Sequence, residues 1–337
     1  MPLRIGRDTI GLPEGVYITE AVGVAGSKEK NGPLGECFDV AFNDDTLNMK
    51  TWEKAESEMQ STAVRTLLKK AGFVPDDIDV IFAGDLLNQC MASSYGLRSL
   101  GIPLMEQFGA CSTMAQTMCA AAVFTASGAS SRAVAVTSSH FCTAERQFRM
   151  PLDYGGQRTP TAQWTVTGAG AALISNNISP VRINALTVGR IVDLKIKDAT
   201  NMGAAMAPAA ADTITRFLRD TNTKPSGYDL ILTGDLGRLG SELLAELMRR
   251  SGYDITGVHN DCGVMIYSPD AKDVNCGGSG CGCSASVLCS HIMQRLRSGD
   301  LHNILFVATG ALMSPTASFQ GESIPSIAHL VHITSVS

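Results

Sequence analysis

The stretches TLLKKAGFVPDDIDVIFAGDL (residues 66–86) and RFLRDTNTKPSGYDLILTGDL (residues 216–236) align without a gap at a constant offset of 150. Seven of the 21 aligned positions are identical, and both copies end in Gly-Asp-Leu. Each copy has the pattern of a helix, a proline-containing turn and an apolar strand. The repeat predicts that the chain is an internal duplication.

Further matches extend the repeat toward the end of each half. Cys111-Ser112 corresponds to Cys283-Ser284, and Ser127-Gly128 corresponds to Ser298-Gly299. The turn-rich segment Asn-Asn-Ile-Ser-Pro at residues 176–180 precedes the point where the pattern restarts. We therefore predict two domains, residues 1–177 and 178–337, each of about 170 residues and large enough to bury a core.

Strand-like apolar runs alternate with helical patterns along the chain. One predicted helix, residues 56–71, places Ala63, Leu67 and Leu68 on one face and ends at Gly72. Near-continuous apolar strands separated by helices are typical of sheets covered on both faces, so the predicted class is α/β with two stacked sheets. The predicted strands are residues 78–83, 133–137, 171–174, 229–233, 304–308 and 326–333.

Composition excludes some function classes. With 18% charged residues and a net charge of −5, the chain offers no broad basic surface, so we expect no nucleic-acid binding. The first residues lack the apolar stretch of a secretory signal, and ten cysteines without a disulfide-scaffold spacing suit a reducing compartment such as the cytoplasm. Residues 108–131 carry no charge but are rich in Ser, Thr and Gly, which favours a buried helix over a membrane span.

Cys111 is the leading candidate for chemistry. It lies at the start of a predicted small-residue helix, where the unpaired N–H groups and the helix dipole lower the pKa of a thiol and favour a nucleophilic thiolate. The alternative is a buried, inert cysteine among alanines and serines, and the repeat-related Cys283 does not decide between them.

Several motifs carry a family resemblance. The doubled half, Gly-Ala-Cys-Ser at residues 109–112 and Thr-Val-Thr-Gly-Ala-Gly-Ala-Ala at residues 165–172 resemble the thiolase fold, most closely its ketoacyl-acyl-carrier-protein synthase III branch. The segments VTSSHF (136–141), VHNDCG (258–263), GGSGCGCSAS (277–286) and IPSIAH (324–329) resemble the stage V sporulation protein AD family. The resemblance covers nearly the whole chain and implies a layered α/β/α/β/α sandwich.

The same resemblance implies a loss of catalytic groups. Enzymes of the fold combine a cysteine with a histidine and with an asparagine or second histidine, whereas Asp235 follows the strand that should deliver the histidine and Cys281 lies near the expected asparagine. Without a base and oxyanion donors, an acyl-transfer step loses its main stabilisation. His259 follows a later helix and is interpreted as structural; His140, at a strand end, is the better pocket candidate, with a structural histidine as the alternative.

The sporulation family resemblance implies a binding function. Its members are associated with the binding of dipicolinic acid (pyridine-2,6-dicarboxylate) during its uptake into the developing spore and its release in germination. The resemblance therefore implies dipicolinate, free or as its calcium chelate, as the ligand. Arginine forks and apolar walls would suit such a ligand. The predicted ligand-binding residues are Cys111, Ser112, His140, Phe141, Arg146, Arg149, Trp164, Asp235 and Cys281. The alternative for the arginines is surface pairing with acids such as Glu145.

Two other functions stay open: an acyltransferase that uses Cys111 as nucleophile with His140 or His259 as an unconventional base, and a scaffold for membrane partners. The spacing C-x4-C-x-C-x5-C from Cys276 to Cys289 lacks the paired knuckles of a zinc site, so we expect neither a metal nor a cofactor. The resemblance further implies a homodimer with residues 133–137 near its interface, and a peripheral position on the cytoplasmic face of the forespore inner membrane, beside integral membrane proteins of sporulation stage V.

Overall fold

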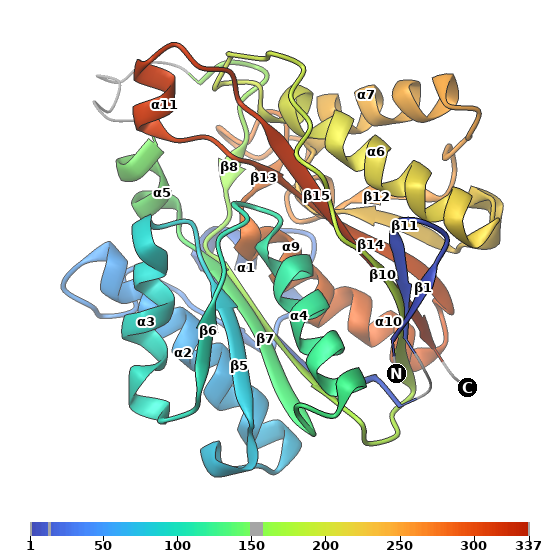
Figure 1. The fold of residues 1–337 in the computed structure, drawn as a ribbon. Coiled ribbons are helices and arrows are strands. Elements are labelled where there is room, and N and C mark those ends of the chain that lie inside the picture. The colour runs from blue at the N-terminus through green and yellow to red at the C-terminus, as the bar shows by residue number, and fades with distance from the viewer. Residues whose placement is uncertain (1, 13–14, 149–157, 336–337) are drawn as a thin grey trace.

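The structure is a computed structural model, and it describes residues 2–12, 15–148 and 158–335. Two mixed β-sheets lie in the centre, each with helices on both faces (Figure 1). The first sheet has the order β3-β9-β7-β5-β6 and the second the order β10-β15-β14-β11-β12. Within the described residues, the two sheets pair through Tyr17 of β3 and Arg182 of β10.

Both sheets repeat one pattern of strand directions. In the first sheet, β3 and β7 run antiparallel to β9, while β5 and β6 run parallel to β7. In the second sheet, β10 and β14 run antiparallel to β15, while β11 and β12 run parallel to β14. The strands are β3 (Tyr17–Ala25), β5 (Val80–Gly84), β6 (Leu104–Glu106), β7 (Arg132–Ser139), β9 (Gly168–Ser175), β10 (Val181–Thr187), β11 (Leu230–Thr233), β12 (His259–Asp261), β14 (Asn303–Ala311) and β15 (Ser326–Ser335).

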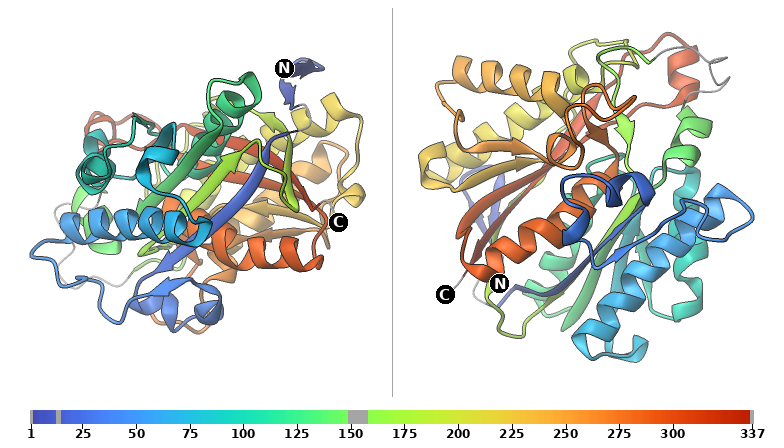
Figure 2. Two further views of the ribbon diagram at one scale, coloured as in Figure 1. Left: turned by 90° about the horizontal axis from the view of Figure 1, so that it is seen from below. Right: turned by 180° about the vertical axis from the view of Figure 1, so that it is seen from behind.

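Helices complete a five-layered sandwich. Between the sheets lie α4 (Thr113–Ser127) and α9 (Cys281–Val287), the latter continuing through a π-helical turn into α10 (Met293–Ser298). The outer face of the first sheet is covered by α2 (Trp52–Ala71), and that of the second by α6 (Met202–Thr221), against which α7 (Gly237–Arg250) packs (Figure 2). The predicted α/β thiolase-type sandwich with two duplicated halves is confirmed.

Small elements surround this frame. They are β1 (Leu3–Ile5), β2 (Thr9–Gly11), β4 (Val40–Ala41), β8 (Trp164–Thr165), β13 (Gly278–Ser279), α1 (Ser27–Lys30), α3 (Met91–Leu97), α5 (Phe141–Phe148), α8 (Cys262–Met265) and α11 (Pro315–Phe319). The hairpin of β1 and β2 pairs with β10, so the beginning of the chain lies on the second sheet. The division at residues 177/178 stays a prediction.

Local sequence explains the helix that opens the first repeat. The Thr51 side chain accepts a hydrogen bond from the Lys54 N–H and caps α2, which therefore begins four residues before the predicted start. Gly72 ends the helix, as predicted, with a left-handed φ of 73°, a conformation that glycine adopts without steric cost.

The uncharged segment forms the central helix. In α4, side chains such as Met114 and Met118 are fully buried, because the helix packs against both sheets. Among the described residues, no helix combines the length and apolar character needed to cross a membrane.

Candidate functional site

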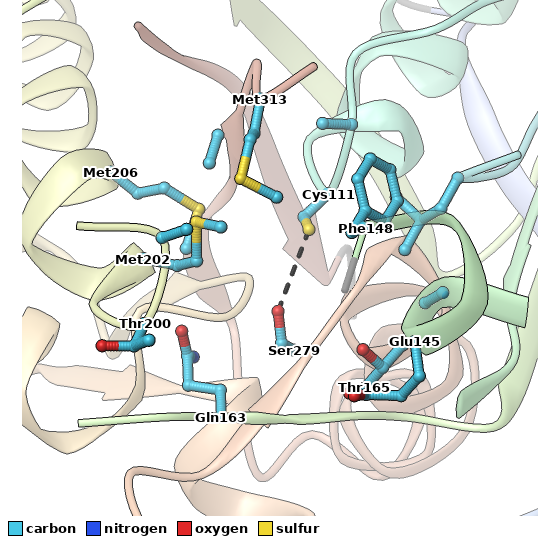
Figure 3. A pocket seen from close by; sticks show the side chains of 15 residues that line it. Cys111, Glu145, Phe148, Gln163, Thr165, Thr200, Met202, Met206, Ser279 and Met313 are labelled. Atoms are coloured by element: carbon cyan, nitrogen blue, oxygen red, sulfur yellow. Dashed lines mark hydrogen bonds between the residues drawn. The ribbon is translucent and has the colours of Figure 1, made fainter. Parts of the chain in front are cut away.

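A pocket of about 300 Å³ lies where the ends of both sheets meet (Figure 3). Its walls come from both halves of the chain, since α5 contributes from one side and α6 and the end of β14 from the other. The lining residues are Leu86, Ala110, Cys111, Ala144, Glu145, Phe148, Gln163, Thr165, Ala199, Thr200, Met202, Met206, Ser279, Ala311 and Met313.

Cys111 lies at the base of this pocket because of a tight turn before α4. Ala110 has a positive φ of 51°, and the Ser112 hydroxyl donates to the Gly109 carbonyl at 2.7 Å. The backbone of Gly310 lies so close that a Cβ there would be 2.3 Å from the Gly109 carbonyl oxygen. The turn and the second sheet together hold the thiol in place.

A polar chain connects Cys111 to Asp235. The Cys111 Sγ lies 4.0 Å from the Ser279 Oγ, and the Ser279 hydroxyl donates to the Asp235 carboxylate at 3.1 Å. Since the single serine proton is used on Asp235, the thiol is the donor in its contact with Ser279. Asp235 also accepts from the Gly280 N–H at 2.9 Å and from the Thr309 hydroxyl at 2.9 Å.

These neighbours reverse the expected acidity of the thiol. Burial and the charge of Asp235 raise the pKa of Cys111 well above its ordinary value, although the helix start alone predicts a lowered one. Burial also raises the pKa of Asp235, while hydrogen bonds from the Gly280 N–H, the Cys111 thiol and the Thr309 and Ser279 hydroxyls oppose that rise. Burial, followed by the charge of Asp235, therefore outweighs the lowering expected from the helix start and favours the neutral thiol at Cys111.

The two histidines considered as bases lie outside the pocket lining. His140 accepts the Cys142 N–H at Nδ1 and donates from Nε2 to the Asp45 carbonyl at 2.9 Å, and burial lowers its pKa. His259 contacts the Thr233 hydroxyl at 3.0 Å, and burial lowers its pKa to about 4. Both histidines are hydrogen-bonded in buried positions, as structural histidines are. His140 was expected in the pocket, but it is not among the lining residues.

The predicted aromatic residues form a closed stack beside the site. The rings of Phe141 and Trp164 lie 3.7 Å apart at an angle of 7°, which leaves no space for a ligand between them. Lys28 covers the outer face of Trp164 at 3.5 Å, and the Arg158 guanidinium lies 5.6 Å from the Phe141 ring. Neither ring belongs to the pocket lining.

The arginines fall into different environments. Arg146 is 60% exposed and pairs with Glu53 at 2.5 Å, which is the surface alternative considered from sequence. Arg149 lies outside the described residues. Arg158 is only 14% exposed and donates to Glu145, a lining residue, at 3.1 Å. Among the described lining residues there is no lysine, arginine or histidine.

Two further predicted residues, Cys281 and Ser112, are buried next to the site and do not line the pocket. The fully buried Cys281 donates to the Ser138 carbonyl at 3.0 Å and packs in a small apolar cluster with Leu86, Ala144 and Cys111. Ser112 is also fully buried and is used in the turn described above. Ser279, two residues before Cys281, is the one that reaches the thiol.

Sequence reasoning missed several lining residues. Ser279 lay within a quoted glycine-rich run, and Thr165 lay within a quoted motif, so a signal for both was present. Gln163, Thr200 and the three methionines 202, 206 and 313 had no such signal, because they become neighbours only when the two halves pack.

The four clustered cysteines have separate environments. Cys276 accepts the Leu239 N–H at 3.4 Å, while Cys283 and Cys289 are buried in the central core. Across residues 2–12, 15–148 and 158–335, no three side chains of His, Cys, Asp or Glu are placed to hold a metal ion.

Comparison with known proteins identifies the family. The model of the family "Stage V sporulation protein AD (SpoVAD)" matches residues 6–334. The chain belongs to this family. The stage V sporulation protein AD of Bacillus subtilis (strain 168) is 48% identical over 324 residues, which cover 96% of each chain. SpoVAD family membership makes the chain a sporulation stage V protein with a thiolase-like fold.

Solved structures of other proteins share the fold. The 3-oxoacyl-[acyl-carrier-protein] synthase III of Aquifex aeolicus aligns with a TM-score of 0.56 at 13% identity, over 98% of this chain and 100% of that one. An OleA variant of Xanthomonas campestris with cerulenin aligns with a TM-score of 0.61 at 14% identity, over 96% and 97%. At this identity the likeness supports a common fold alone.

Proposed function

We propose that this SpoVAD family chain is a non-catalytic binding protein for dipicolinate, free or as its calcium chelate, and serves its uptake into the developing spore and its release in germination. The observation that carries the proposal is the chain Cys111–Ser279–Asp235 at the base of a formed pocket. A carboxylate beside the thiol opposes formation of the thiolate that acyl transfer requires. The chain therefore has a cavity that can hold a ligand, while its cysteine is disfavoured as a nucleophile.

The shape of the pocket suits a single aromatic ring. Its volume of about 300 Å³ is at the lower end of small-molecule sites. Phe148 lies on one side and Met202, Met206 and Met313 on the other (Figure 3), and flexible thioethers pack well against flat rings.

Titration calorimetry with dipicolinate, with and without calcium, tests the proposal, with benzoate as the monocarboxylate control. We expect saturable binding near one ligand per chain that benzoate does not reproduce. Ala199→Trp, at the exposed rim of the pocket, should abolish binding, whereas Ala129→Trp, in an exposed loop outside the lining, should leave it unchanged. Absence of saturable binding would contradict the proposal.

The competing functions give different results in the same preparation. An acyl adduct on Cys111, which lines the pocket, after incubation with acyl thioesters would support an acyltransferase. If neither ligand nor adduct were found, a scaffold for membrane partners would remain.

The proposed setting is the cytoplasmic face of the forespore inner membrane, where integral membrane proteins of stage V hold the chain. The proposed assembly is a homodimer. Strand β7 has β5 and β9 on its two sides, so the open edge available to a second copy in the first sheet is β6, near the exposed Met105 and Phe108. Sedimentation of the wild type and of Met105→Lys tests this arrangement, since the charge should favour the monomer.

A further inference from the structure

Gln163 presents a fixed hydrogen-bond acceptor to the pocket. The residue is only 5% exposed, and its Nε2 donates to the Asp235 carbonyl at 2.6 Å and to the Gly278 carbonyl at 3.0 Å. Because carbonyl oxygens only accept, these two contacts determine which end of the amide is the nitrogen. The Oε1 atom has no partner in the part of the chain that the structure describes, and Figure 3 shows it pointing into the pocket.

The backbone of Gln163 is held as firmly as its side chain. Arg158 donates to the Gln163 carbonyl at 2.5 Å and to Glu145 at 3.1 Å, so the same guanidinium connects two lining residues. A buried acceptor without a partner costs free energy unless a ligand supplies a donor or a cation.

The rest of the lining is also rich in acceptors. The Ser279 proton is used on Asp235, and the Thr200 hydroxyl donates to Asp198 at 2.7 Å. Glu145 adds a carboxylate, whose charge Arg158 balances from outside the described lining. A free dianion would thus meet lone pairs at Gln163 and Glu145 with few donors to offset them.

We infer that Gln163 selects the charge state of the ligand: the pocket takes a carboxylate ligand together with a positive partner at the Gln163 Oε1. That partner is a proton on the ligand or a divalent cation chelated by it, since either one converts the repulsive contact into a hydrogen bond or a coordination bond. This inference rests on the proposed function, because it concerns the same pocket and the same ligand class.

Calorimetry of the full chain with dipicolinate separates the two sources. Titrations at several pH values between about 6 and 8, in buffers of different ionisation enthalpy, are run with a chelator and then with equimolar calcium. With the chelator present, we expect uptake of about one proton per ligand bound. Binding should then become roughly tenfold weaker for each unit by which the pH rises. A cation as the partner predicts that calcium removes both effects and tightens binding.

Gln163→Met tests the residue, with Gln60→Met as the matched control. Gln60 is also fully buried, donates from Nε2 and has an unpartnered Oε1, but it lies outside the pocket lining. We expect Gln163→Met to weaken the dependence of dipicolinate affinity on protons or calcium at least about tenfold. Gln60→Met should retain this dependence, although it should lower the Tm by a similar amount.

The outcomes are distinct. Saturable binding by the wild type with neither proton uptake nor a calcium effect would overturn the inference and leave the proposed function intact, even if Gln163→Met did not fold. Equal dependence in the two variants would also overturn it. No dipicolinate binding under any condition would overturn the proposed function and this inference together.

Discussion

Asp85 and Asp235 occupy equivalent positions in the two repeats but hold different networks. Asp85 accepts the Ser93 N–H and hydroxyl and the Leu87 N–H, all within the first half. Asp235 accepts from Ser279, Gly280 and Thr309 and faces the Cys111 thiol across the junction of the halves. One repeated residue therefore stabilises a loop in one copy and controls a thiol in the other.

Replacement of Asp235 should change the reactivity of Cys111. Asp235→Asn removes the negative charge that, after burial, most raises the pKa of the thiol, so alkylation of Cys111 near neutral pH should become faster. The pH dependence of labelling, followed by peptide mass spectrometry, measures this change. Asp85→Asn serves as the control and should leave labelling at Cys111 unaltered; equal acceleration in both variants would contradict the assignment.

The two arginine pairs should differ in their contribution to stability. Arg158→Met removes the ion pair with Glu145, which is only 13% exposed, and should lower the free energy of unfolding by about 1.5–3 kcal/mol, the range for a hydrogen bond to a charged group. Arg146→Met breaks an exposed pair and should cost no more than about 1 kcal/mol. Urea denaturation measures both.

The same pair of variants also tests the pocket. Because Arg146 pairs with Glu53 away from the lining, Arg146→Met should leave dipicolinate affinity within about twofold of wild type. A larger loss would return Arg146 to the list of ligand-binding residues. Adding Glu145→Gln to Arg158→Met should recover part of the lost stability, since the carboxylate that has lost its bond to Arg158 is then neutral.

Gly310 should tolerate no side chain. Gly310→Ala places a Cβ 2.3 Å from the Gly109 carbonyl oxygen and 3.0 Å from the Ser112 nitrogen, so the turn that carries Cys111 must shift. We expect a loss of about 1–3 kcal/mol in stability and weaker ligand binding. Gly227→Ala is the control, because its Cβ meets nothing within 4 Å; a similar loss there would show that the effect is not specific to the turn.

Stability should fall between about pH 5 and pH 8. Burial and the charge of Asp85 raise the pKa of Glu56 to about 8, and burial raises the pKa of Glu29 and Asp261 to about 7. The native state then retains protons that the unfolded chain releases near its ordinary carboxyl pKa. This contribution is fully present below that value and is lost as the pH rises through the folded-state pKa values.

Glu56→Gln should flatten this dependence. The Thr143 and Ser138 hydroxyls that donate to Glu56 can reorient to accept from an amide. We expect a gain on the order of 1–3 kcal/mol at pH 8 and little change near pH 5, measured by urea denaturation at each pH. The exposed Glu246→Gln should show no such difference, and an unchanged slope in Glu56→Gln would exclude Glu56 as the source.

Sequence by itself determined the duplicated α/β architecture, the Gly72 end of α2 and the position of Cys111 before a buried helix. These features follow from local hydrophobic periodicity, glycine conformation and a repeat that is visible along the chain. Family resemblance added the sandwich and the missing catalytic histidine.

Only the tertiary structure decided what Cys111 faces and which side chains line its pocket. Gln163, Met206 and Ser279 are far apart in sequence and meet because the two sheets bring their ends together. The helix start predicts an acidic thiol, but a pKa depends on every charge and on the solvent lost around it, and Asp235 approaches from the other half. Likewise, His140 donates a hydrogen bond to the carbonyl of Asp45, which lies 95 residues away in sequence, and it does not line the pocket. No local sequence pattern predicts this contact.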